Sequence, residues 1–218
     1  MWFGPEHEFQ LPADRYNPGG YFQRRDVVEA NRRLIESASG SMETPPAPEQ
    51  VLTLGHQKAL STADIAWTSG IELSGLKDPR FSVTLLSWIR ADKFAGKDLR
   101  VIRLERPAKA VVASAMRHRE VGSFCDYDAS RLLRMSELYD RYARWHIMNL
   151  DLPSTTVSFD RLIKDTDAVV TELAIFLSIS DAERVACACN RVGKRRALIM
   201  HYLKKFGSPQ RLFEAMHK

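Results

Sequence analysis

The chain has 218 residues, of which 44% are hydrophobic and 27% charged, and its net charge is +5 at pH 7. This composition is typical of a globular protein and excludes a wholly disordered, collagen-like or disulfide-stapled chain. The longest apolar run falls well short of the ~18 residues that a membrane-spanning helix needs. The N-terminal residues also lack the basic start and apolar stretch of a secretory signal, so we expect no membrane partner.

The cysteines are few and do not form a recognisable set. Cys125, Cys187 and Cys189 are odd in number, and no second Cys/His pair lies at zinc-ligand spacing. We interpret all three as reduced thiols in a cytoplasmic protein that holds no metal.

The first third of the chain predicts irregular structure and two helices. Residues 1–22 are rich in Pro, Gly and aromatic residues and show no hydrophobic period, so we expect them to be irregular. Residues 26–37 have the spacing of an amphipathic helix, for which Asp26 is a fair N-cap. A Pro-rich surface loop at 40–50 and a helix at 51–66 follow.

Three segments have the pattern of short strands, namely Ile71–Lys77, Leu99–Leu104 and Thr155–Phe159. Helices are predicted between and after them, at Pro79–Arg90, from Pro107, at Ala129–Leu150 and at Asp160–Leu177. Strands that alternate with long helices predict an α/β fold with a parallel sheet. We expect one domain over residues 1–218, with a helical, basic portion from about residue 181.

Ligands of parallel α/β sheets bind beyond the carboxyl ends of the strands, and the first such end is Lys77-Asp78-Pro79-Arg80. Lys77 and Arg80 could reach an anion beside the amides of the following helix. The alternative is that Asp78 only caps the helix and that the two basic side chains are solvated.

The second strand end is Glu105-Arg106-Pro107, with Ser114 eight residues beyond Arg106. Arg106 leaves a strand beside a helix N-terminus, a geometry that suits a phosphate. Ser114 lies two helical turns on, about 10 Å along the axis. The alternative is that Arg106 pairs with Glu105 and that Ser114 packs against the preceding turn.

Other chemistries have little support. The chain contains no G-x-x-x-x-G-K-[ST], G-x-G-x-x-G or G-x-S-x-G motif, and Leu76 stands where the first would need Lys after Gly70 and Gly75. The basic C-terminal stretch has an apolar face at 197–203, which favours a docked amphipathic helix. We therefore do not expect a nucleic-acid partner.

Four segments stand out by their order and spacing: P-A-D-R-Y-N-P-G-G-Y-F-Q-R-R-D-V-V-E-A-N-R-R-L-I (12–35), G-L-K-D-P-R-F (75–81), V-I-R-L-E-R-P-A-K-A-V-V-A-S (101–114), and V-S-F-D-R-L-I-K-D with E-L-A-I-F-L-S-I (157–179). Together they resemble the bacterial branch of the sulfotransferase family, enzymes that use 3′-phosphoadenosine 5′-phosphosulfate as donor. The resemblance covers most of residues 10–180.

The resemblance implies a parallel-sheet sandwich of P-loop NTPase-like type, in which Arg106 and Ser114 hold the 3′-phosphate of the donor. It implies transfer of a sulfuryl group to a small-molecule acceptor, a hydroxyl or an amine, without a metal. Lys77 would supply positive charge near the transferred group, and Asp78 is the carboxylate available as a base.

Two departures from the family leave a non-catalytic binding protein as the alternative. Relatives have a strand, a phosphate loop and a helix before the N-P-x-G-Y-F segment, whereas Asn17 lies only sixteen residues after Met1. Gln23 also replaces a frequent Glu. In relatives the missing strand lies inside the sheet. We expect its place to be filled by another segment, by direct pairing of its neighbours or by a partner chain, so association into a homo-oligomer stays open. The remaining alternative is that the working protein has a longer N-terminus, which supplies the strand and the loop.

Overall fold

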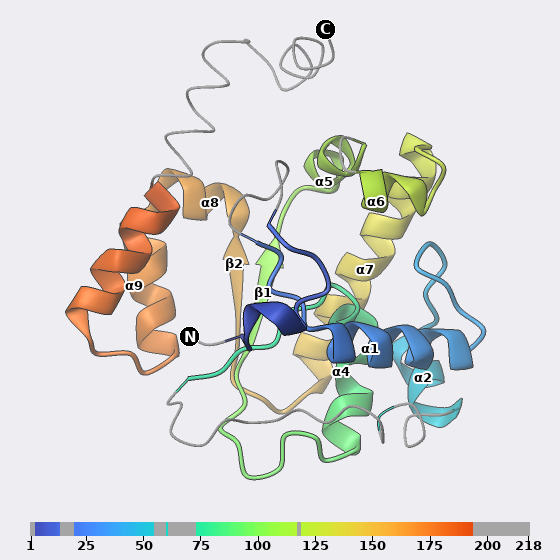
Figure 1. Ribbon diagram of the computed structural model, residues 1–218, viewed down its shortest axis with the longest axis horizontal. Coiled ribbons are helices and arrows are strands. Elements are labelled where there is room, and N and C mark those ends of the chain that lie inside the picture. Colours follow the sequence, from blue (N-terminus) through green and yellow to red (C-terminus); the bar gives the residue numbers. More distant parts are fainter. Residues whose placement is uncertain (1–2, 14–19, 55–59, 61–72, 117–118, 194–218) are drawn as a thin grey trace, which may run out of the picture. The chain divides into compact units, whose positions relative to one another are not determined.

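The computed structural model describes residues 3–13, 20–54, 60, 73–116 and 119–193 (Figure 1). It is a mixed α/β protein that contains a small parallel sheet. The chain divides into two compact units: Met1–Leu99 with Ala108–Leu152, and Arg100–Pro107 with Pro153–Lys218. At residues 100–107 the chain passes from the first unit into the second, and it returns to the first at Ala108.

The described part of the first unit is helical. Its elements are η1 (Glu6–Glu8), α1 (Arg25–Ser37), α2 (Pro48–Leu54), α4 (Phe81–Arg90), α5 (Ala108–Ala115), α6 (Arg119–Ser123) and α7 (Ala129–Asn149). Helix α4 packs against α1, α2 and α7, and α7 also packs against α5. The predicted helices at 26–37, 79–90 and 129–150 are thus confirmed, with ends that differ by one or two residues.

Helix α1 shows how the sequence produces these elements. Its apolar residues recur at helical spacing and form one buried face that includes Val27, Leu34 and Ile35. The predicted N-cap is wrong, because Arg24 occupies that position. Asp26 lies in the first turn, where it accepts hydrogen bonds from the Arg24 guanidinium and from the Val27 amide.

Two clusters of buried side chains form the core of the first unit. The larger joins α1, α2 and α4: Val27, Ala30, Leu34, Ile35, Val51, Leu60, Val83 and Trp88. The smaller lies between α5, α7 and the segment before α7: Ala115, Cys125, Leu132 and Met135. Burial of these apolar side chains is the main force that holds the helices together.

The second unit holds β1 (Val101–Glu105) and β2 (Ser154–Ser158), which pair in parallel with Val101 opposite Ser154 and Glu105 opposite Ser158. Helices α8 (Phe159–Lys164) and α9 (Thr166–Phe176) follow, and residues 182–193 are helical. Both strands were predicted within two residues. Of the strand predicted at 71–77, residues 71–72 lie outside the described residues, and 73–77 contain only one bridge residue, Ser74.

The helix predicted at 160–177 is two helices. Asp165 separates α8 from α9 with φ −130° and ψ 59°. The Thr166 hydroxyl donates to the Leu162 carbonyl at 2.8 Å. Asp and Thr compete for backbone groups in this way, and the sequence D-T-D interrupts the helix where apolar periodicity alone predicts continuity.

Candidate functional site

Arg106 lies where the two strands of the parallel sheet end. It follows Glu105, the last residue of β1, while Phe159 begins α8 directly after β2. The register pairs Glu105 with Ser158 and so brings these two successors side by side. The guanidinium carbon of Arg106 lies 4.8 Å from the centre of the Phe159 ring.

A guanidinium stacked on an aromatic face is held in position, while its N–H bonds point outward in its own plane. Arg106 is half-buried and precedes Pro107 and the first residue of α5. Glu105 accepts from the Arg103 guanidinium at 3.3 Å, an ion pair within β1. This arrangement presents a planar donor group at the carboxyl ends of parallel strands, which suits an oxyanion.

Ser114 is half-buried in α5. It belongs to the helical unit, whereas Arg106 belongs to the sheet unit. Because Arg106 and Ser114 lie in different units, the binding of one phosphate by both residues stays a prediction.

Lys77 and Asp78 are neighbours whose side chains have different surroundings. Lys77 is exposed, and its Nζ donates to the Tyr21 carbonyl at 2.9 Å. This contact joins the Y-F segment to the K-D-P-R segment across 56 residues of chain. The positive charge of Lys77 therefore lies at a junction of two of the segments that carry the family resemblance.

The Asp78 side chain is fully buried, and its carboxylate is part of a polar network. One oxygen, Oδ1, accepts from the Arg80 amide and from its guanidinium, both at 3.0 Å. The other, Oδ2, accepts from Asn31 Nδ2 at 2.9 Å. A carboxylate so occupied and shielded does not favour a role as a solvent-accessible base, and it holds the turn before α4 against α1.

Asn31 completes this network, and its part in it was not predicted from the sequence. Its Oδ1 accepts from the Thr84 hydroxyl at 2.6 Å and from Trp88 Nε1 at 2.7 Å. The available signal was position, because Asn31 falls between Val27 and Leu34 on the apolar face of α1. A polar residue on such a face predicts a satisfied buried network. Phe159 was also missed as a partner of Arg106.

Several other site types receive no support from the described residues. Among them, no group of three or more His, Cys, Asp or Glu side chains lies so as to hold a metal ion. None of the helices in the described part of the chain has the length and apolar character to cross a bilayer. Cys125 is buried, and burial raises the pKa of its thiol.

Comparison of the chain with protein-family models, with curated proteins and with solved structures found no match. The functional argument therefore depends on the residues and their geometry alone.

Proposed function

We propose that the chain is a sulfotransferase-like protein of the P-loop NTPase-like fold type, which transfers a sulfuryl group from 3′-phosphoadenosine 5′-phosphosulfate to a hydroxyl or amine. The observation that carries this proposal is the placement of Arg106. It stands at the carboxyl ends of two parallel strands, stacked on Phe159, at the start of a helix. Such a position suits the 3′-phosphate of the donor.

The pairing of the four resembling segments adds support. In the helical unit, Lys77 and Asp78 of the second segment bond to Tyr21 and Asn31 of the first. In the sheet unit, β1 of the third segment pairs with β2 of the fourth.

In the proposed reaction, the acceptor oxygen or nitrogen forms a bond to sulfur while the bond from sulfur to the bridging phosphate oxygen breaks. Adenosine 3′,5′-bisphosphate leaves with that electron pair, and the acceptor loses its proton to a base. Lys77 supplies positive charge near the developing negative charge on the oxygens. Asp78 is buried and bonded to Asn31 and Arg80, so we assign it to holding the turn that follows Lys77 and leave the base unassigned.

The test is calorimetric titration of the full chain with adenosine 3′,5′-bisphosphate. We expect binding that Arg106→Ala weakens about 10- to 100-fold, because a charge-assisted phosphate contact is lost. Arg106→Lys should restore only part of the affinity, since Lys has no planar fork. Arg144→Ala, which removes an exposed arginine of α7, is the matched control and should bind like the wild type.

A non-catalytic relative is the second candidate, and the burial of Asp78 favours it. It predicts that the nucleotide binds and that Arg106→Ala weakens binding, while no sulfuryl transfer to phenol or amine acceptors is detected. Absence of binding by the wild-type chain, or equal binding by Arg106→Ala, would reject both candidates.

A further inference from the structure

The helical unit contains a pocket of about 290 Å³ where the end of α1 and the loop after it meet the residue that follows α6. This size is near the lower limit of small-molecule sites. The apolar side chains that line the pocket include Ile35, Met42 and Phe124. The charged side chains that line it are Arg32, Glu36 and Glu43.

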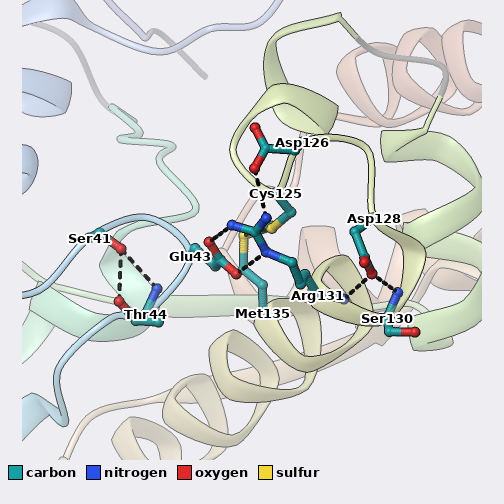
Figure 2. Close-up of polar contacts among 9 residues, drawn as sticks. All are labelled: Ser41, Glu43, Thr44, Cys125, Asp126, Asp128, Ser130, Arg131 and Met135. Atoms are coloured by element: carbon teal, nitrogen blue, oxygen red, sulfur yellow. Dashed lines mark hydrogen bonds and ion pairs between the residues drawn. The ribbon is translucent and has the colours of Figure 1, made fainter.

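Close contacts hold the walls of the pocket together. Gly40 packs so closely on Pro46 that a Cβ there would lie 2.3 Å from the Pro46 ring. Ser41 and Thr44 close the loop with a 2.9 Å hydrogen bond between their hydroxyls (Figure 2). The Tyr139 hydroxyl lies 3.5 Å from the Met42 sulfur and orients that side chain.

Glu43 is held by Arg131, as Figure 2 shows, with Nε to Oε1 at 2.6 Å and a second contact from Nη2 to Oε2. On the other side of the same guanidinium, Nη1 donates to Asp126 at 2.7 Å. This link fastens the loop after α1 to the start of α7. The Arg131 contact also lowers the pKa of Glu43, so this carboxylate stays ionised at neutral pH.

The charges around the pocket leave an excess of carboxylate. Arg32 donates from Nε and Nη2 to Glu29 and from Nη1 to Glu36 Oε1 at 2.6 Å. Of the charged side chains that line the pocket, Glu36 and Glu43 are carboxylates and Arg32 is a guanidinium. Asp128 and Arg134, also near Glu43, add one charge of each sign. The charged side chains of the lining, two carboxylates and one guanidinium, therefore sum to one negative charge in a chain whose net charge is +5.

We propose that this pocket binds a small organic cation, an ammonium group on an apolar body. The ammonium would pair with Glu36, and the apolar body would contact Phe124, Met42 and Ile35. Aromatic faces and thioethers are favourable neighbours for such ligands. This inference does not rest on the proposed transferase activity.

The experiment is titration of the full chain with three matched probes, 2-phenylethylamine, 2-phenylethanol and 3-phenylpropionate, followed by protein-observed NMR. We expect the amine to bind with the lowest Kd and to shift resonances of the residues that line the pocket. Glu36→Gln should weaken amine binding about threefold or more while leaving the weak alcohol binding unchanged. Phe124→Leu, which keeps an apolar wall, should reduce the preference for amine over alcohol.

Glu137→Gln is the matched control, since Glu137 is an exposed carboxylate of α7 that does not line the pocket. Circular dichroism melting curves of each variant show whether it is folded. Equal affinities for amine and alcohol, amine binding that Glu36→Gln leaves unchanged, or no binding of any probe would each overturn the proposal. Because no donor nucleotide is used, these outcomes are separate from the test of Arg106.

Discussion

Asn31 connects three parts of the helical unit through one side-chain amide. It donates to Asp78 and accepts from Thr84 and Trp88, all of them buried. Such a network is stabilising only while every member is paired, because an unpaired buried polar group bears the full cost of lost hydration. Asn31 therefore links the K-D-P-R turn to α1 and α4.

We predict that Asn31→Ala lowers the free energy of unfolding by about 3 kcal/mol or more, since each buried partner left unpaired costs ~1–3 kcal/mol. Urea denaturation followed by circular dichroism measures this loss. Arg33→Ala is the control on the exposed face of the same helix and should have a much smaller effect. Equal losses for the two variants would show that the network does not stabilise the fold.

At single residues, the sequence predicts the position along the fold better than it predicts the surroundings of the side chain. Lys77, Asp78 and Arg106 were identified from their places after strands or turns, and Arg106 does lie at a strand end. The burial of Asp78 was not predictable, because it depends on Asn31, 47 residues away in sequence. Only the packing of α1 on α4 brings these two residues together.

Among the elements, α7 is the longest described helix and has a well-defined start. Asp128 is its N-cap, and the carboxylate accepts from the amides of Ser130 at 2.8 Å and Arg131 at 2.9 Å. These backbone contacts, that of Arg131 first, lower the pKa of Asp128. The cap satisfies donors that would otherwise have no partner in the helix.

We predict that Asp128→Ala lowers the midpoint of thermal unfolding by a few degrees, because two helix-terminal amides lose their acceptor. Asp128→Asn keeps an oxygen acceptor and should retain most of the stability. Differential scanning calorimetry at pH 7 makes the comparison. A melting curve of Asp128→Ala that superimposes on the wild type would contradict the role of this cap.

Helices with a clear apolar face were predictable, and short strands only in part. The pattern of α1 and α7 extends over many residues, so chance agreement is small. The alternation at 71–77 is brief, and Leu76 packs against the helical core of α1 and α4 instead of a sheet. Period-two patterns of this length do not distinguish a strand from an extended loop whose apolar residues reach a core.

For the whole molecule, stability should depend on pH through His146, which is buried between α7 and α4. Burial lowers the pKa of His146 from 6.5 to about 4, an effect that the Val83 backbone partly offsets. Between those pH values the unfolded chain binds more protons than the folded one. The stability that His146 contributes is therefore fully present above pH 6.5 and is lost as the pH drops toward 4, by about 3 kcal/mol in total.

We predict that His146→Phe flattens the dependence of unfolding free energy on pH between 6.5 and 4, whatever its effect at pH 8. Urea denaturation at a series of pH values measures the slope. His7→Gln removes an exposed histidine and should keep the wild-type slope. A slope that is the same in His146→Phe and the wild type would contradict a neutral buried imidazole.

The architecture of the whole chain was predictable only in its class. Alternation of strands and helices correctly indicated a mixed α/β protein with parallel pairing. The division into two units depends on residues 100–107, which belong to the second unit although the chain on both sides of them belongs to the first. No local sequence pattern predicts this assignment. Long-range connectivity of this kind depends on which strand finds which partner, and propensity and periodicity describe only near neighbours.

Because residues 100–107 belong to the second unit, the polypeptide crosses between the units three times, after Leu99, after Pro107 and after Leu152. A protease that severed the bond between Leu152 and Pro153 would not release the C-terminal fragment. The fragment would stay fastened through the ladder that joins Val101–Glu105 to Ser154–Ser158.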